Sequence, residues 1–175
     1  MAILGSKDYK IGLIIARSQP FHNGHLRAIT EALMYCDEVI FSIRDYDTAY
    51  FDYNIAQKVF RELMGGVVNK VSFFGITNDP SLGTPKHVIE RTLKRLEEAR
   101  YNIPTHFFTN SELWVEPAKE LQLHTTRIAT LADHNSDEIY SSFINGTDLW
   151  KQKVPHSVLE TLESYIATKN RNTKN

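Results

Sequence analysis

The sequence contains a single cysteine and no long apolar run. One cysteine, Cys36, among 175 residues excludes a disulfide within the chain and is compatible with a reducing compartment. Its surroundings, EALMYCDEV, are typical of a small buried side chain. No apolar run approaches the ~18 residues that a membrane span needs, and MAILGSKDYK is too short and too mixed in charge for an export signal. We therefore expect a cytoplasmic protein that has no membrane partner.

An excess of positive charge is also missing. The chain carries 20 Lys and Arg against 21 Asp and Glu, with seven His and a formal net charge of −1. No global basic field draws it to nucleic acid, so any cation that binds phosphate must act locally. The length fits one domain, residues 1–175, with a core at about 10–168 and a polar tail at 169–175.

Short apolar runs alternate with amphipathic segments along the chain. The expected strands are residues 11–16, 38–43, 67–75, 105–108 and 126–131, and the expected helices are residues 25–35, 53–64, 85–100, 112–121 and 154–165. This alternation predicts βαβ units in an α/β fold with a doubly wound parallel sheet, closed by a C-terminal helical segment. Ligands bind such sheets at the carboxyl ends of the strands, near the topological switch point.

The loop after the first strand, RSQPFHNGH, carries polar groups that packing does not require. Asn23-Gly24 forms the expected helix entrance, where unpaired backbone N–H groups and the helix dipole favour an anion. His22 and His25 flank this entrance, and Arg17 offers a bidentate guanidinium. The set suits a phosphoryl or nucleotidyl centre, where catalysis consists mainly of positioning and charge stabilisation. Two alternatives are loop histidines that only cap and solvate the turn, and metal ligation, although no third ligand stands at a suitable spacing.

The segment IGLIIARSQPFHNGHL resembles the first motif of the HxGH nucleotidyltransferase superfamily. It is most similar to the GRFQPFHNGHL form of archaeal-type nicotinamide-mononucleotide (NMN) adenylyltransferases, with Ser18 in place of the usual aromatic residue. The resemblance implies a Rossmann-like fold and transfer of AMP from ATP, with Mg²⁺ bridging the phosphates. It also implies that His22, His25 and Arg17 are catalytic, and it gives a larger set of ATP- and phosphate-binding residues: Ala16, Arg17, Ser18, His22, Gly24, His25, Thr109, Asn110, Ser141 and Ser142.

Two later segments are similar to the family but depart from its pattern. Tyr140-Ser141-Ser142 is similar to the serines that begin a phosphate-binding helix in the family, yet the family's following arginine is missing. Lys151, Lys153 and Arg127 are the candidates to replace it, and spacing favours none of them. A cap without a ligand role is the alternative for the two serines.

The resemblance is weaker for the acceptor nucleotide. Its candidate ligands are Arg44, Tyr46, Asn78 and Asp79. Trp114 and Trp150 are interpreted as packing residues, because neither lies where the family places its stacking tryptophan.

Three functions follow from this pattern. The resemblance implies first an adenylyltransferase that joins ATP and NMN, or nicotinate mononucleotide, to give NAD and pyrophosphate. Alternatively the chain is a transferase of the same fold with another acceptor, or a nucleotide-binding protein without turnover. By resemblance we also expect a homo-oligomer.

Overall fold

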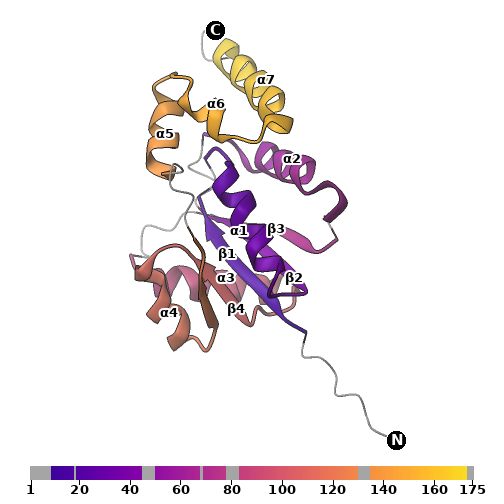
Figure 1. Cartoon of the computed structure of the whole chain (residues 1–175), viewed down its shortest axis with the longest axis vertical. Helices are drawn as coiled ribbons and strands as arrows, with labels where there is room; N and C mark the ends of the chain where they lie inside the picture. The colour runs from indigo at the N-terminus through magenta and orange to yellow at the C-terminus, as the bar shows by residue number, and fades with distance from the viewer. Residues whose placement is uncertain are drawn as a thin grey trace, which may run out of the picture.

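The computed structural model describes residues 9–17, 19–44, 50–67, 69–77, 83–129 and 135–172 (Figure 1). These residues form one parallel sheet in the order β3-β2-β1-β4-β5. The strands are β1 (Ile11–Ala16), β2 (Glu38–Arg44), β3 (Val71–Ile76), β4 (His106–Thr109) and β5 (His124–Arg127). The predicted α/β class with a doubly wound parallel sheet is confirmed.

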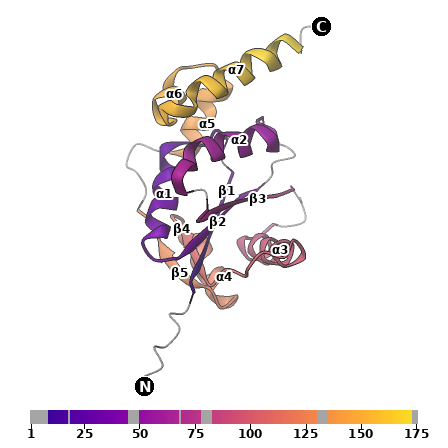
Figure 2. The ribbon, with the colours of Figure 1, turned by 90° about the vertical axis from the view of Figure 1, so that its right-hand side faces the viewer.

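Helices cover both faces of the sheet. They are α1 (Asn23–Leu33), α2 (Tyr53–Met64), α3 (Pro85–Glu98), α4 (Val115–Glu120), α5 (Ser136–Ile144), α6 (Leu149–Lys153) and α7 (His156–Asn172), with single 3₁₀ turns η1 (Gly65–Val67) and η2 (Glu112–Trp114). Figure 2 shows α1 and α2 on one side of the sheet and α3 and α4 on the other, with α5, α6 and α7 gathered beyond α2. None of the described helices combines the length and apolar composition that crossing a membrane requires.

The apolar runs of the sequence become strands that are buried on both faces. In β2, Phe41 packs in the cluster beneath α1 and α2, whereas its neighbour Ile40 packs in the cluster beneath α3 and α4. Gly12 in β1 permits close packing, because a Cβ there would lie 2.8 Å from Cε2 of Phe108. The missing side chain thus leaves room for the Phe108 ring of β4 and for Cys36, which follows α1.

The strand order creates a switch point beside β1. From β1 the chain moves outward through β2 and β3, then returns to the other side of β1 as β4 and β5. The connections leave the carboxyl ends of β1 and β4 in opposite directions, which opens a crevice between them. The loop RSQPFHNGH begins at this crevice.

Several predicted boundaries are wrong. The fifth strand, expected at 126–131, is His124–Arg127, because Gln122 in a left-handed conformation (φ 62°) turns the chain from α4 directly into the strand. The third strand begins at Val71 and not at residue 67, because the glycine pair and Val67 form η1. The helix expected at 112–121 is divided into η2 and α4.

The C-terminal tail is also corrected in part. We expected a polar tail from residue 169, but α7 extends to Asn172. Lys169 donates a hydrogen bond to the carbonyl oxygen of Tyr50 and lies 3.9 Å from the centroid of the Tyr50 ring. This contact fixes the last turns of α7 to the segment that precedes α2.

Candidate functional site

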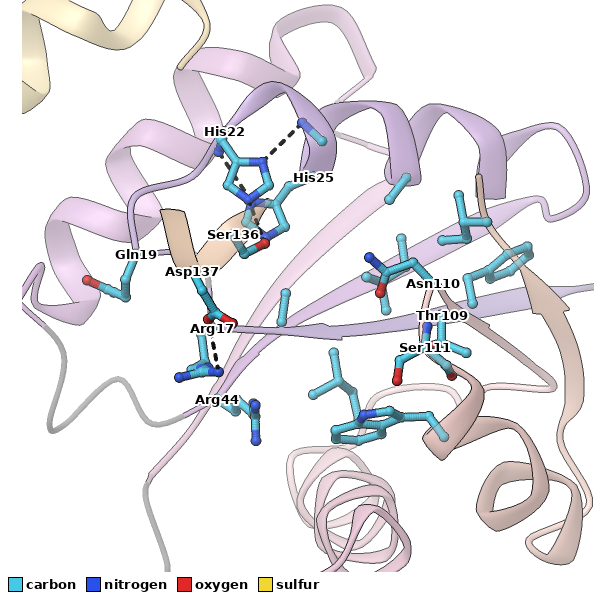
Figure 3. A pocket seen from close by; sticks show the side chains of 18 of the residues that line it. Arg17, Gln19, His22, His25, Arg44, Thr109, Asn110, Ser111, Ser136 and Asp137 are labelled. Atoms are coloured by element: carbon cyan, nitrogen blue, oxygen red, sulfur yellow. Dashed lines mark hydrogen bonds and ion pairs between the residues drawn. The ribbon is translucent and has the colours of Figure 1, made fainter. Parts of the chain in front are cut away.

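A pocket of about 720 Å³ lies at the carboxyl ends of β1 and β4 (Figure 3). Its walls come from the ends of β1, β2 and β4, from the first turns of α1 and α5, and from η2. It therefore occupies the switch point that the strand order creates, and parts of the chain more than 100 residues apart meet there.

The two histidines of the motif cap the beginning of α1. The Gly24 N–H donates to Nδ1 of His22 at 3.1 Å, and the His22 N–H donates to Nδ1 of His25 at 3.2 Å. The His25 N–H bonds to the His22 carbonyl oxygen at 2.9 Å. The backbone N–H groups of Gly24 and His25 therefore bond within the turn, whereas we expected the Asn23-Gly24 entrance to offer unpaired N–H groups to an anion.

These caps determine which ring nitrogen of each histidine carries the proton. A neutral imidazole whose Nδ1 accepts a hydrogen bond must hold its proton on Nε2. Nε2 of His22 lies 3.1 Å from Oγ of Ser136, at the start of α5, and the two imidazole centroids are 3.8 Å apart. Both histidines line the pocket, and in the neutral form each has Nδ1 engaged in the turn and its proton on Nε2.

The residues between Arg17 and His22 hold this arrangement in place. Phe21 is 5% exposed and its ring packs against His25, Phe41 and Phe60. Gln19 accepts a hydrogen bond from the Phe51 N–H at 3.0 Å and donates to the Phe51 carbonyl oxygen at 3.3 Å. The loop is thus anchored to the core on one side and to the segment before α2 on the other.

Among the residues that the structure describes, two cations and one carboxylate line the pocket. Arg17 follows β1, and its Nη2 lies 3.7 Å from Oδ1 of Asp137 in the first turn of α5. Arg44 ends β2, and its Cζ lies 5.6 Å from the centroid of the Trp114 ring. The indole in turn stacks against Phe107 of β4, with centroids 6.1 Å apart. Arg44 and Trp114 therefore form a second, aromatic part of the pocket. Figure 3 shows Arg44 below Arg17 and Asp137.

The end of β4 supplies a polar edge. Thr109 is 9% exposed, and its Oγ1 accepts the Ser111 N–H at 3.1 Å. This turn leaves Asn110 exposed at the pocket.

Most of the predicted site residues come together at the pocket. Those that line it are Ala16, Arg17, His22, Gly24, His25, Arg44, Thr109 and Asn110. Four others, Ser18, Tyr46, Asn78 and Asp79, lie outside the described residues. Two more, Ser141 and Ser142, do not line it.

The helix start expected at Ser141 and Ser142 is wrong. Helix α5 begins at Ser136, so both serines lie in its second half. Ser142 is 7% exposed; its Oγ accepts the Trp150 N–H at 3.1 Å and shares a hydrogen bond of 2.7 Å with Thr147 Oγ1. Its hydroxyl joins α5 to α6.

The candidates for the missing arginine are also placed away from the pocket. Arg127 pairs with Glu112 at 2.9 Å. Lys151 pairs with Glu163 and Asp148, and these hydrogen bonds raise its pKa. Among the described residues that line the pocket, none is Arg127, Lys151 or Lys153.

Sequence reasoning missed residues on two walls. Ser136 and Asp137 follow the N-cap Asn135, whose side chain accepts the Asp137 N–H at 3.0 Å. The pattern Asn135-x-x-Glu138 is a helix-start signal that could have located α5. Trp114, interpreted as packing, both packs and lines the pocket.

Among the described residues no group of three or more His, Cys, Asp or Glu side chains is placed to hold a metal ion. The lining offers one carboxylate, that of Asp137, beside the amide and hydroxyl oxygens of β4. This donor set does not form a protein cage. It fits a divalent ion carried by the phosphates of a ligand.

No protein-family model matches the chain, and a search of curated proteins finds no match. Solved structures do match. A bifunctional NMN adenylyltransferase/ADP ribose pyrophosphatase from Francisella tularensis has a TM-score of 0.64 and 19% identity over 83% of this chain and 45% of its own. A protein from Vibrio parahaemolyticus, assigned as a nicotinate-nucleotide adenylyltransferase, has a TM-score of 0.56 and 18% identity over 88% of this chain and 98% of its own. The NadR protein, complexed with NAD and AMP-PNP, has a TM-score of 0.55 and 16% identity over 86% of this chain and 46% of its own.

The chain shares the fold of these solved structures. It spans less than half of the length of the Francisella protein, which has also been solved with AMP and a manganese ion. At 16–19% identity the likeness concerns the fold, so the function must be argued from the site.

Proposed function

We propose that the chain is a nucleotidyltransferase that moves AMP from ATP to NMN or to nicotinate mononucleotide, giving NAD or its acid analogue and pyrophosphate. The observation that carries this proposal is the pair of backbone hydrogen bonds to Nδ1 of His22 and His25. These bonds orient two Nε2–H donors at the switch point of an adenylyltransferase-like fold. A loop that needed only caps and solvation would not require two adjacent imidazoles, with centroids 3.8 Å apart, at a ligand-sized pocket.

The reaction requires positioning and charge stabilisation. The phosphate of the acceptor attacks the α-phosphorus of ATP in line with the bond to the leaving pyrophosphate. Negative charge develops on the oxygens around the α- and β-phosphates, where the histidine N–H groups and Arg17 donate hydrogen bonds. One P–O bond forms as another breaks, so no covalent enzyme intermediate is needed.

In this proposal the two nucleotides occupy different parts of the pocket. Gly24 and Ala28 of α1 and the edge of β4 border one part, which suits the adenosine of ATP. Arg44 and Trp114 border the other part, which suits the ring of the acceptor nucleotide. The solved relatives that bind AMP, or NAD with AMP-PNP, support two nucleotide subsites in this fold.

Mg²⁺ enters the proposal as part of the ATP ligand. When bound to the phosphates, it neutralises part of their charge and orients them. Asp137, Thr109 and Asn110 would face an ion bound in this way. The protein's own contribution is to bind and orient the phosphates through Arg17 and the two histidines.

One observation favours a second candidate, a transferase of the same fold with another acceptor. The start of α5 contributes Asp137 to the pocket, and the described lining contains no third cation beside Arg17 and Arg44. The phosphate-binding wall therefore differs from the pattern expected by resemblance. A nucleotide-binding protein without turnover would share this feature.

Product analysis separates these functions. The protein is incubated with ATP and Mg²⁺ and with NMN, nicotinate mononucleotide or other phosphate monoesters, and the products are separated by chromatography. NAD or its acid analogue is expected. Pyrophosphate release only with another ester supports the second candidate, and saturable ATP binding without product from any ester excludes both transferases.

A further inference from the structure

The first turn of α5 contacts both phosphate-binding elements of the opposite wall. Oγ of Ser136 lies 3.1 Å from Nε2 of His22, and Oδ1 of Asp137 lies 3.7 Å from Nη2 of Arg17 (Figure 3). Two adjacent oxygens of α5 thus stand where the oxygens of a bound phosphate would be expected. In this structure the chain partners its own anion-binding groups.

The carboxylate of Asp137 adds a negative charge to the pocket, whereas the hydroxyl of Ser136 does not. Asp137 is the one anionic side chain in the described lining, against two cations, Arg17 and Arg44. A phosphate that binds Arg17 must displace Asp137 or lie beside it. The ion pair does not prevent displacement, because both side chains are exposed (61% and 85%) and such pairs contribute little to stability. The like charges that then face each other repel in proportion to the charge of the ligand.

We propose that Asp137 is a specificity-determining residue that makes the pocket select nucleotides by phosphate charge. It competes for Arg17 and repels metal-free polyphosphates, so the pocket favours the Mg²⁺-neutralised nucleoside triphosphate over the free one. This inference rests on the proposed function only in taking the ligand to be a nucleotide.

A purely structural role for Asp137 must be distinguished from this one. A carboxylate in the first turn of a helix stabilises the helix through its dipole, and Asp137 has this position in α5. Glu138 has it too, is exposed, and does not line the pocket. Glu138→Gln therefore removes the same charge from the same turn and serves as the matched control.

The test measures the dissociation constants of AMP, ADP and ATP by calorimetry, in EDTA and again with Mg²⁺, for the wild type and both variants. In EDTA, Asp137→Asn should tighten ATP binding by ~5-fold, the effect of one like charge at about 4 Å in water. The gain should fall from ATP to ADP to AMP and shrink when Mg²⁺ is added. Glu138→Gln should change every constant by less than ~2-fold, since its carboxylate is solvated and outside the pocket.

The outcomes separate this inference from the proposed function. An Asp137→Asn variant that binds ATP equally well or more weakly overturns the inference, even if the wild type makes NAD. A gain in affinity that is equal for AMP, ADP and ATP, or that Glu138→Gln reproduces, also overturns the inference. The graded gain without any dinucleotide product supports the inference and refutes the proposed function. If the wild type binds none of the nucleotides, both fail.

Discussion

Replacing His25 by asparagine separates the two tasks that its imidazole performs. Nδ1 accepts the His22 N–H at 3.2 Å and so caps the turn, while the ring lines the pocket and, in our proposal, offers its Nε2–H to the phosphates. An asparagine Oδ1 occupies nearly the position of Nδ1 and can accept the same N–H, but it places no donor where Nε2 was. His25→Asn is therefore expected to keep the turn and lose the donor.

The magnitudes follow from these contacts. Losing one preorganised donor to a developing anion lowers kcat by ~10²–10³-fold, or about 3–4 kcal/mol of transition-state stabilisation. Losing the cap as well costs about 1 kcal/mol of folding stability, which lowers Tm by ~2–4 °C in a protein of this size. We thus expect His25→Asn to reduce turnover strongly at nearly unchanged Tm, and His25→Ala to reduce both.

Steady-state kinetics of dinucleotide formation and calorimetric unfolding check this prediction together. The KM for ATP should change less than kcat, because the donor acts mainly on charge that develops during the reaction. His25→Asn with wild-type turnover would refute the assigned role of Nε2. A fall in Tm as large as that of His25→Ala would refute the capping role of Nδ1.

Three further predictions concern other parts of the molecule. Arg44→Gln should lower kcat/KM for nicotinate mononucleotide by ~10-fold or more, the value of a charged hydrogen bond. It should change kcat/KM for NMN by less than ~3-fold, because only the acid form carries a carboxylate that the arginine can bind. Equal losses for both acceptors would contradict this prediction. Ser142→Ala should leave the Trp150 N–H buried and unsatisfied, costing about 1–3 kcal/mol and several degrees of Tm at unchanged ATP affinity; weaker ATP binding would restore the phosphate role expected from the sequence. Burial lowers the pKa of His106 below its ordinary 6.5, and so do the neighbouring His124 and Lys10. The unfolded chain therefore binds more protons than the folded one below pH 6.5, and the free energy of unfolding should fall as the pH drops from about 6.5. Chemical denaturation across this range should show a flatter pH dependence for His106→Gln, and an identical slope in both proteins would refute this prediction.

The parts of the fold that sequence predicts well depend on local patterns. Strand β1 and helix α2 were predicted with the observed bounds, because a continuous apolar run and a helical repeat ending at a glycine pair are strong local signals. The motif could likewise be placed between the first strand and the first helix. The orientation of its imidazoles could not, because it depends on hydrogen bonds within the folded turn.

The errors arise where tertiary contacts outweigh local patterns. Strand β5 has no apolar run of its own, and its register depends on pairing with β4, His106 opposite His124. The polar end of α7 stays helical because Lys169 contacts Tyr50, 119 residues earlier. Trp114 reaches the pocket only because β4 and β2 bring it beneath Arg44.

The start of α5, which forms one wall of the site, is placed wrongly by similarity to a family motif. The residues Tyr140-Ser141-Ser142 resemble the family's pattern of residue types, yet the helix begins five residues before Ser141. Physical signals in the same segment, an N-cap asparagine with acidic residues in the first turn, indicate the observed start. Capping chemistry was here a better guide than similarity of letters.

The fate of the ATP phosphates tests the central claim most directly. The protein is incubated with Mg²⁺, an acceptor mononucleotide and ATP labelled with phosphorus-33 at either the α- or the γ-position, and the products are separated. If AMP is transferred to the acceptor, the α-label enters the dinucleotide and the γ-label leaves in pyrophosphate. Label in ADP and orthophosphate, or γ-label on the acceptor, would contradict transfer of an adenylyl group at this site.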